Sequence, residues 1–165
     1  MNTVDFIREA TILDLKYIDK YVTGNVGIGF IPKPTIERII LKQERFKSRF
    51  IVYEENLDLV GFSYYSIAET TRIFMMFVQE DARRFYRASR MVSYIEDEAR
   101  NKFGVFMKVR VANHLESNDF WKAMGYLKQY EDMGRWLNKP TKGASVVNVY
   151  FKALIPTFFY QGRDM

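Results

Sequence analysis

The spacing of hydrophobic residues predicts strands and helices that alternate along the chain. A short strand comes first, and Leu15, Ile18 and Val22 then recur at helical spacing on one face of a following helix. Glycine and proline cluster after this helix and predict a loop, with Pro34 suited to the first turn of a second helix. The other elements expected in this part are a strand at residues 6–10, a loop at 24–34 and a hairpin of strands at 50–53 and 59–67.

The middle of the chain has the pattern of two strands joined by a long helix. Residues 72–78 are expected to form a strand in which every residue from 73 to 78 is apolar, which is typical of a central strand buried on both faces. Asp81 is a good N-cap for a helix that runs to about Lys102, and residues 105–111 then alternate as a strand with one drier face. The buried stripe of the helix is expected to contain Phe85, Ala88, Val92, Ile95 and Ala99.

The order of the elements predicts an α/β fold of the α+β sandwich kind. A short helix at residues 117–124 and strands at 126–130 and 146–154 complete the series. Because a helix separates the strands at 72–78 and 105–111, we expect these two strands to be adjacent and parallel.

The chain is expected to form one domain with a short tail. No repeat, low-complexity stretch or linker divides its 165 residues, which is the size of one ordinary domain. We expect the domain to span residues 1–154 and an aromatic C-terminal tail to span residues 155–165. Phe158, Phe159 and Tyr160 should pack on the body or on a partner, because three exposed aromatic side chains together would be an unusual surface patch.

The composition excludes several classes of protein and site. Hydrophobic residues make up 48% and charged residues 27% of the chain, which excludes wholesale disorder. The absence of cysteine excludes disulfides and thiolate nucleophiles, and a single histidine excludes a multi-histidine zinc site, so we expect no metal. The longest apolar run is too short to span a bilayer, and residues 1–10 carry charges where a signal peptide needs an apolar core. We therefore expect a cytoplasmic protein without a membrane partner.

Positive charge is concentrated in the second half of the chain. The formal net charge is +5, and residues 81–165 hold 15 basic against 9 acidic side chains. Arg83, Arg84, Arg87 and Arg90 fall within eight residues. Clustered guanidinium groups suit a phosphate ligand, because they are forked donors with a permanent charge. A solvated basic helix face is the alternative interpretation of the same cluster.

Two segments of the chain resemble the sequence motifs of one family. Residues 78–91 read VQEDARRFYRASRM, in which a strand ends in Val and leads into a loop at the start of a long helix. Residues 113–126 read NHLESNDFWKAMGY, with an Asn after the next strand, a short helix, an aromatic pair and a closing Gly. These segments resemble motifs A and B of the GNAT superfamily of N-acyltransferases. The resemblance implies a mixed, mostly antiparallel six- to seven-stranded sheet, with splayed parallel strands at its centre and helices on both faces.

The resemblance also implies that acetyl-coenzyme A binds as a co-substrate. The main chain of Phe77 and Val78 is expected to pair with the pantetheine arm, and the start of the long helix to bind the pyrophosphate, because free amides there favour an anion. Tyr86 stands where the motif has its first glycine, and Arg84 and Arg87 bracket it. The residues implied for the coenzyme are Phe77, Val78, Arg83, Arg84, Phe85, Tyr86, Arg87, Ala88, Ser89 and Asn113.

Catalytic roles are expected for His114 and Glu69. His114 follows the strand at 105–111, near the implied acyl site, and an imidazole suits a base that deprotonates an amine near neutral pH. Glu69, at the turn before the strand at 72–78, is near where some family members place a catalytic carboxylate. The alternative is a structural role for both residues, as a hydrogen-bonding loop histidine and as an exposed turn residue.

These features predict an acyl-coenzyme A-dependent N-acyltransferase, in which a primary amine attacks the thioester directly. The expected acceptor amine belongs to a small molecule, a protein or, given the basic second half, a nucleic acid. The alternative is a catalytically inactive GNAT-like structural or interaction protein, such as a phage virion-associated protein located in the virion. Tyr86 favours this alternative, as does Trp121, whose indole N–H stands where many family members have a Tyr acid. The tail would then contact a virion protein or another partner, or a second copy in a homodimer.

Overall fold

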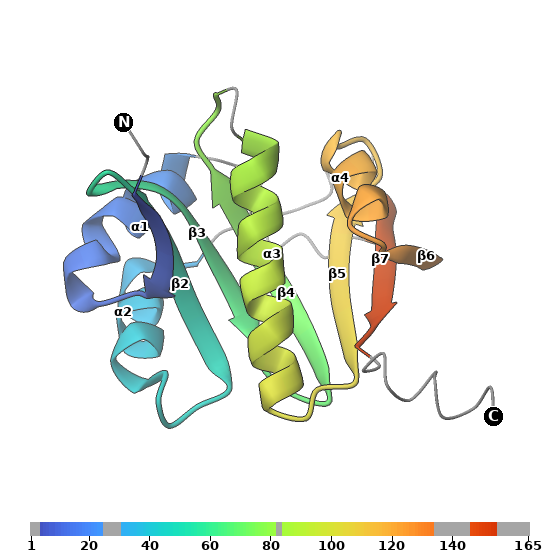
Figure 1. Cartoon of the computed structure of the whole chain (residues 1–165), viewed down its shortest axis with the longest axis horizontal. Helices are drawn as coiled ribbons and strands as arrows, with labels where there is room; N and C mark the ends of the chain where they lie inside the picture. Colours follow the sequence, from blue (N-terminus) through green and yellow to red (C-terminus); the bar gives the residue numbers. More distant parts are fainter. Residues whose placement is uncertain (1–3, 25–30, 82–83, 134–145, 155–165) are drawn as a thin grey trace.

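The computed structural model describes residues 4–24, 31–81, 84–133 and 146–154, which form one mixed sheet with helices on both faces (Figure 1). The elements in chain order are β1 (Asp5–Glu9), the 3-10 helix η1 (Ile12–Asp14), α1 (Leu15–Gly24), α2 (Lys33–Lys42), β2 (Ser48–Glu55), β3 (Asp58–Ser66), β4 (Thr70–Val78), α3 (Arg84–Asn101), β5 (Phe106–Ala112), α4 (Ser117–Ala123), β6 (Leu127–Met133) and β7 (Val146–Ala153). The seven strands lie in the order β1-β2-β3-β4-β5-β7-β6, and each neighbouring pair is antiparallel except β4 and β5. The predicted α/β fold is confirmed.

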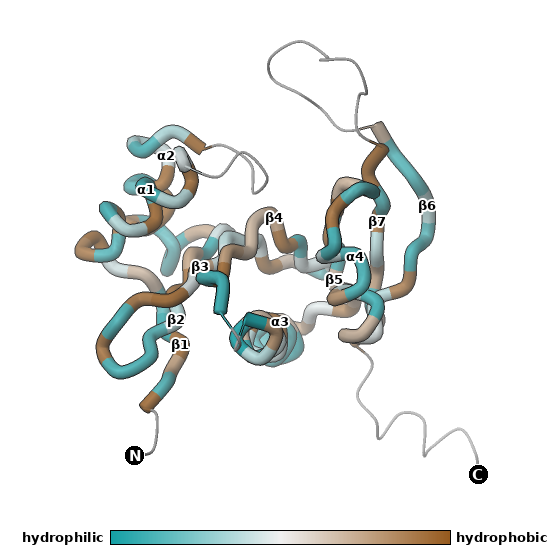
Figure 2. The backbone as a smooth tube through the Cα atoms, turned by 90° about the horizontal axis from the view of Figure 1, so that it is seen from above, coloured by the Kyte–Doolittle hydropathy of each residue, from teal (hydrophilic) through white to brown (hydrophobic). Residues whose placement is uncertain are grey.

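Each face of the sheet packs against its own pair of helices. In β2, Phe50 and Val52 are buried with α1 and α2, while Ile51 and Tyr53 belong to the core that α3 and α4 complete. This alternation follows from the two-residue repeat of a strand, which turns successive side chains to opposite faces. Figure 2 shows α1 and α2 over the β2–β3 part of the sheet and α3 on the opposite side.

The central strands β4 and β5 are parallel and separate toward their C-terminal ends. Four residue pairs form the ladder between them, and the last pair joins Ile73 to Val109. Beyond this point β4 continues to Val78 and β5 to Ala112 without further pairing between the two strands. The predicted parallel arrangement and the divergence of these strands are confirmed.

A β-bulge in β4 explains where the strands separate. Tyr64 of β3 lies opposite Met75, and the next residue of β3 lies opposite Ile73. Phe74 is therefore an extra residue in β4, and such a bulge bends its strand and increases the local twist. Because Phe74 directly follows the last pair of the ladder to β5, the bend directs the rest of β4 away from β5.

The expectation that β4 is buried on both faces is wrong. Thr71, Ile73 and Met75 are buried, but Arg72 and Phe74 are exposed. The reason is the position of α1 and α2, which cover mainly β2 and β3 and leave part of β4 open on that face (Figure 2).

The predicted buried stripe of α3 is also only partly correct. Val92, Ile95 and Ala99 are fully buried, but Phe85 is 57% exposed. The helix begins at Arg84, so Phe85 belongs to a first turn that projects past the core. Its ring packs edge-on against that of Phe120 in α4, with 5.3 Å between the ring centroids.

The predicted C-terminal tail, residues 155–165 with its three aromatic side chains, lies outside the described residues. Among the helices that the structure describes, none combines the length and the apolar character that crossing a membrane requires.

Candidate functional site

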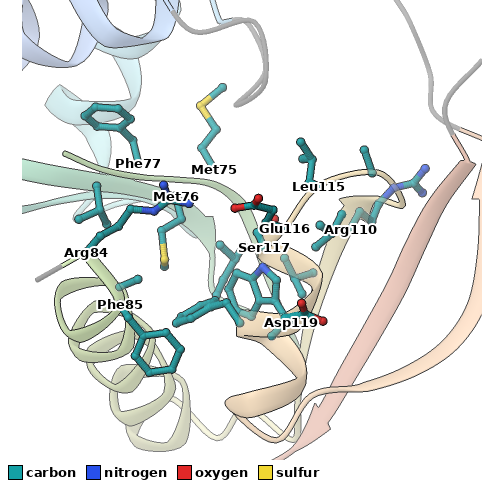
Figure 3. A pocket seen from close by; sticks show the side chains of 18 of the residues that line it. Met75, Met76, Phe77, Arg84, Phe85, Arg110, Leu115, Glu116, Ser117 and Asp119 are labelled. Atoms are coloured by element: carbon teal, nitrogen blue, oxygen red, sulfur yellow. The ribbon is translucent and has the colours of Figure 1, made fainter. Parts of the chain in front are cut away.

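The gap between the splayed ends of β4 and β5 is a cleft with a volume of about 1220 Å³ (Figure 3). Its walls come from α1, β4, the first turns of α3, β5, and α4 with the turn that precedes it. Most of the lining is apolar. The charged side chains that line the cleft are Glu80, Arg84, Arg110, Glu116 and Asp119.

The edge of β4 that faces the cleft offers main-chain groups for hydrogen bonds. The amide of Gln79 donates to the Val60 carbonyl of β3 at 2.9 Å. In an antiparallel pair the backbone groups of alternate residues point to the same neighbour, so those of Met76 and Val78 point the other way, toward β5. The ladder to β5 has already ended there, and an extended ligand can bond to this edge as a further strand would.

Phe77 contributes its side chain to the cleft and not its main chain. By the same alternation the amide and carbonyl of Phe77 point to β3. The main-chain groups at the open edge therefore belong to Val78, as predicted, and to Met76 in place of Phe77. The ring of Phe77 forms the α1 side of the cleft, stacked on Tyr21 with 4.4 Å between the ring centroids.

Gly61 allows β3 to approach this part of β4 closely. A Cβ at this position would lie 2.7 Å from the carbonyl oxygen of Phe77, a backbone atom that cannot turn aside. We expect Gly61→Ala to lower the free energy of unfolding by about 1–3 kcal/mol and to displace β4 at the cleft. Urea unfolding measures this loss. Gly24→Ala is the control, because nothing lies within 4 Å of its added Cβ, and an unchanged midpoint for Gly61→Ala would contradict the close contact.

The first turn of α3 lies at the mouth of the cleft. Arg84, Phe85 and Ala88 line the cleft, three of the residues that the sequence resemblance implies for the coenzyme. The first amides of a helix lack intrahelical acceptors and, with the helix dipole, favour an anion. Arg84 pairs with Glu80 at 2.8 Å, an exposed contact of little energy that leaves the guanidinium accessible to a ligand. Arg83 lies outside the described residues.

Arg87 turns away from the cleft into a buried ion-pair network. Its guanidinium bonds to Glu55 at the end of β2, and to Asp81 at 2.7 Å. The hydrogen bond to Glu55 raises the pKa of Arg87 above its usual value, against the lowering effect of burial. Arg87 therefore ties the start of α3 to β2. Its guanidinium is not presented to a phosphate, contrary to the role that the sequence resemblance implies.

Three other residues implied for the coenzyme do not line the cleft. The Tyr86 hydroxyl accepts a hydrogen bond from Arg90 at 3.1 Å, and the Ser89 hydroxyl donates to the Tyr86 carbonyl at 2.8 Å. The phenol thus lies toward the next turn of α3 and not across the helix start. The amide of Asn113 donates to the Val146 carbonyl at the start of β7.

A buried asparagine holds the turn between β5 and α4. The side-chain amide of Asn118 donates to the carbonyls of Ala112 and Leu115, at 2.9 and 2.7 Å. Its oxygen accepts hydrogen bonds from Asn148 and Tyr150 of β7, at 3.0 and 2.8 Å. These bonds fasten the turn to β7 and fix the residues before α4 at the side of the cleft.

Glu116, in this turn, presents its carboxylate to the gap between the strands. Figure 3 shows it pointing from the start of α4 toward the side where Met75 and Met76 of β4 lie. The side chain is exposed, and within the described part of the chain it forms no ion pair. A carboxylate at this place can accept a proton from an amine that enters the cleft.

The two residues with predicted catalytic roles are not brought to the cleft. His114 is exposed in the turn after β5 and is not among the described residues of the lining, although Leu115 and Glu116 of the same turn are. Glu69 lies in the β3–β4 turn, where its carbonyl accepts hydrogen bonds from the amides of Val105 and Phe106. That turn is at the N-terminal end of β4, whereas the cleft opens at the C-terminal end of the strand.

Trp121 does line the cleft, where the resemblance places a proton donor. It is 4% exposed, and its ring packs edge-on against Phe120 and Tyr126 with centroid distances of 5.1 and 5.0 Å. An indole N–H is a hydrogen-bond donor and not an acid at neutral pH, so this side chain shapes the cleft wall.

Sequence reasoning missed Met76, Arg110 and Glu116. The two-residue alternation of the strand at 72–78, combined with its pairing to β3, would have identified Met76. Arg110 belongs to the alternating strand expected at residues 105–111, where the pattern alone gives it no role in a site. Glu116 lies within the motif-like segment, but only the geometry of the turn shows that it faces the gap (Figure 3). His114, two residues earlier, is not among the described residues of the lining.

Comparisons with known proteins give one matching family and several similar structures. A family model described as an acetyltransferase (GNAT) domain matches residues 30–135. None of the curated proteins matches the sequence. Ard1 from Thermoplasma volcanium has a similar structure, with 17% identity, a TM-score of 0.75 and coverage of 92% of this chain and 99% of its own.

Two further solved structures are similar. One is the ribosomal-protein-alanine N-acetyltransferase from Brucella melitensis, with 14% identity, a TM-score of 0.73 and coverage of 90% of this chain and 99% of its own. The other is yncA from Salmonella typhimurium with its cofactor acetyl-CoA, with 14% identity, a TM-score of 0.73 and coverage of 94% and 96%. At these identities the three structures show a shared fold.

Proposed function

Because this chain belongs to the GNAT acetyltransferase family, we propose that it transfers an acetyl group from acetyl-coenzyme A to an amine in the cleft between β4 and β5. The observation that supports this proposal most directly is that three features suited to acetyl transfer face the same gap between the strands. The open edge of β4, the first turn of α3 and the carboxylate of Glu116 all face it.

The cleft suits acetyl-coenzyme A in shape and charge. The backbone groups of Met76 and Val78 would pair with the amides of the pantetheine arm, as a neighbouring strand would. The first turn of α3 and the guanidinium of Arg84 would hold the pyrophosphate. Residues from both faces of the sheet line the cleft, so the coenzyme on the α3 side leaves the opposite side open to the acceptor.

The residues at the gap account for the chemistry of transfer. Bound acetyl-coenzyme A supplies a thioester carbonyl carbon, to which the amine forms a C–N bond as the C–S bond breaks. Glu116 takes the proton that the amine loses, and a main-chain amide at the open edge of β4 stabilises the oxyanion. The thiolate of coenzyme A must then be protonated. Because Trp121 is not an acid, we propose that water donates this proton.

Acetyl-coenzyme A is expected to raise the melting temperature of the protein, since a ligand that binds only the folded state stabilises it. Added salt should weaken this shift, because part of the binding is between charges at the protein surface. Arg84→Ala should reduce the shift, whereas Arg100→Ala should not. Arg100 is a matched control, because it lies at the other end of α3 in a similar exposed pair, with Asp97 at 3.0 Å.

Differential scanning fluorimetry with increasing acetyl-coenzyme A measures this effect. The absence of any shift at millimolar coenzyme would contradict the proposed function and would favour an interaction protein without catalysis. Equal shifts in melting temperature for the two arginine variants would contradict only the role of Arg84 and would leave the proposed function standing.

A further inference from the structure

A strip of β4 and β5 that no described helix covers continues from the cleft on the face that α1 and α2 share. Met107, Val109 and Val111 of β5 are buried in the core with α3 and α4, so the residues between them point to the other face. Arg72 is paired with Lys108 in the β4–β5 ladder, so both side chains point to the same face of the sheet. We call this surface the basic strip, and its members are Arg72 and Phe74 of β4 with Phe106, Lys108 and Arg110 of β5.

Two cations lie side by side in the basic strip. Arg72 and Lys108 are direct neighbours across the β4–β5 ladder, an arrangement that like charges disfavour. No ion pair links either side chain to an acidic residue in the described ranges, and the Lys108 ammonium lies over the ring of Phe151, 5.6 Å from its centroid. An anionic ligand that bridges the two side chains would relieve this repulsion.

Exposed aromatic rings flank the two cations. Phe74 is 49% exposed and Phe106 is 40% exposed, on either side of the Arg72–Lys108 pair along the strands. Such rings can contact the apolar parts of a ligand whose charges are bound by the cations. The combination favours a chain that carries both acidic and apolar groups over a small inorganic anion.

The basic strip is continuous with the acceptor side of the cleft. Phe74 and Arg110 belong to both surfaces, and Arg110 is kept in place by Asp132 of β6 at 2.9 Å. From Arg110 to Phe106 the strip extends four residues along β5, or about 13 Å, which is the length of about four residues of extended peptide. If the amine of an acceptor chain lies in the cleft, the residues of that chain a few positions away would therefore lie over Arg72 and Lys108.

We infer that the acceptor is a polypeptide with acidic side chains within a few residues of the acetylated amine, and that the basic strip binds those side chains. This inference rests on the proposed acetyl transfer, because it concerns the acceptor of that reaction. A single-stranded nucleic acid also combines negative charge with stacking groups, but its backbone carries no aliphatic amine to receive the acetyl group. The strip starts where such an amine would react, which favours the peptide.

Peptide binding tests the basic strip without requiring turnover. The probes are two eight-residue peptides with a C-terminal fluorescein and the same first two residues, one with Asp and Glu at positions 3–6 and one with Asn and Gln. By fluorescence anisotropy, the acidic peptide should bind at least tenfold more tightly, and added salt should weaken it. Arg72→Glu with Lys108→Glu should abolish the preference. Lys16→Glu with Lys102→Glu, at exposed sites elsewhere, makes the same change in charge and should preserve it.

The outcomes separate the basic strip from the proposed function. Equal binding of the two peptides, or a preference that persists in the Arg72→Glu/Lys108→Glu variant with an unchanged melting temperature, would overturn the inference. Tighter binding of a labelled thymidine oligonucleotide, lost in the same variant, would overturn it in favour of nucleic acid. Transfer from acetyl-coenzyme A to small amines together with equal peptide binding would leave the proposed function intact. Peptide binding without transfer to any amine would overturn the proposed function, and with it the acceptor role of the strip.

Discussion

Glu116→Gln is expected to lower kcat for acetyl transfer by about 100-fold, the range typical of losing a general base. Glu116 is the acidic side chain that Figure 3 shows pointing across the gap toward β4. The amide of Gln has nearly the same shape but cannot take the proton from the attacking amine. The shift in melting temperature with acetyl-coenzyme A should remain, because Glu116 lies apart from the first turn of α3 that is assigned to the pyrophosphate.

Two variants act as comparisons in the same thiol-release assay. Asp119→Asn removes a second acidic side chain of the cleft lining, which lies apart from Glu116 in Figure 3. Because Asp119 has no part in the proposed proton transfer, this change should alter kcat by less than about threefold. His114→Ala tests the assignment that the sequence favours. A large loss for His114→Ala with little effect of Glu116→Gln would reverse our assignment of the base.

Arg87→Met is expected to destabilise the fold by about 3–5 kcal/mol, the usual effect of breaking a buried ion pair from one side. The side chains of Arg87 and Glu55 are 7% and 9% exposed, so the Glu55 carboxylate would lose its guanidinium partner away from water. Asp81 would lose the same partner, and the start of α3 would be less firmly held to β2. Urea unfolding at neutral pH measures the loss.

A second substitution distinguishes the ion pair from simple packing. Adding Glu55→Gln to Arg87→Met removes the buried charge and should recover part of the stability, because a neutral pair is often no worse than a buried ionic one. Arg100→Met, in an exposed pair on the same helix, should cost less than about 1 kcal/mol. A loss for Arg87→Met as small as that for Arg100→Met would contradict the structural role of Arg87.

The hydrophobic pattern predicted the fold because it reports which faces of the elements are buried. The long helix between the strands at 72–78 and 105–111 was enough to predict a parallel pair at the centre, and the structure has it. The bulge at Phe74 was not predictable, because nothing local distinguishes one apolar residue in an apolar run from the extra one. It depends on the register between β3 and β4, which involves residues far apart in the sequence.

The site was predicted less well, because a motif gives the order of residues but not the direction of their side chains. Arg84 and Arg87 look equivalent in the sequence. They are three positions apart, yet one lines the cleft and the other is drawn inward by Glu55, a residue from a distant strand. His114 and Glu116 are likewise close in the sequence, but only Glu116 lines the cleft. The turn that carries both is held by the hydrogen bonds of Asn118 to the turn and to β7.

The short ladder between β4 and β5 also bears on how the chain folds. The strands β2, β3 and β4 follow one another as antiparallel hairpins, and β5, β7 and β6 form a second group. Four residue pairs and the crossover helix α3 join the two groups. Local hairpins form faster than parallel pairs across a long connection, since the loop to be closed is shorter. The hairpins of β2, β3 and β4 and the hairpin of β6 and β7 can therefore form first. Because β5 pairs with β4 and with β7 across long connections, the site is created only in the step that inserts β5 between them.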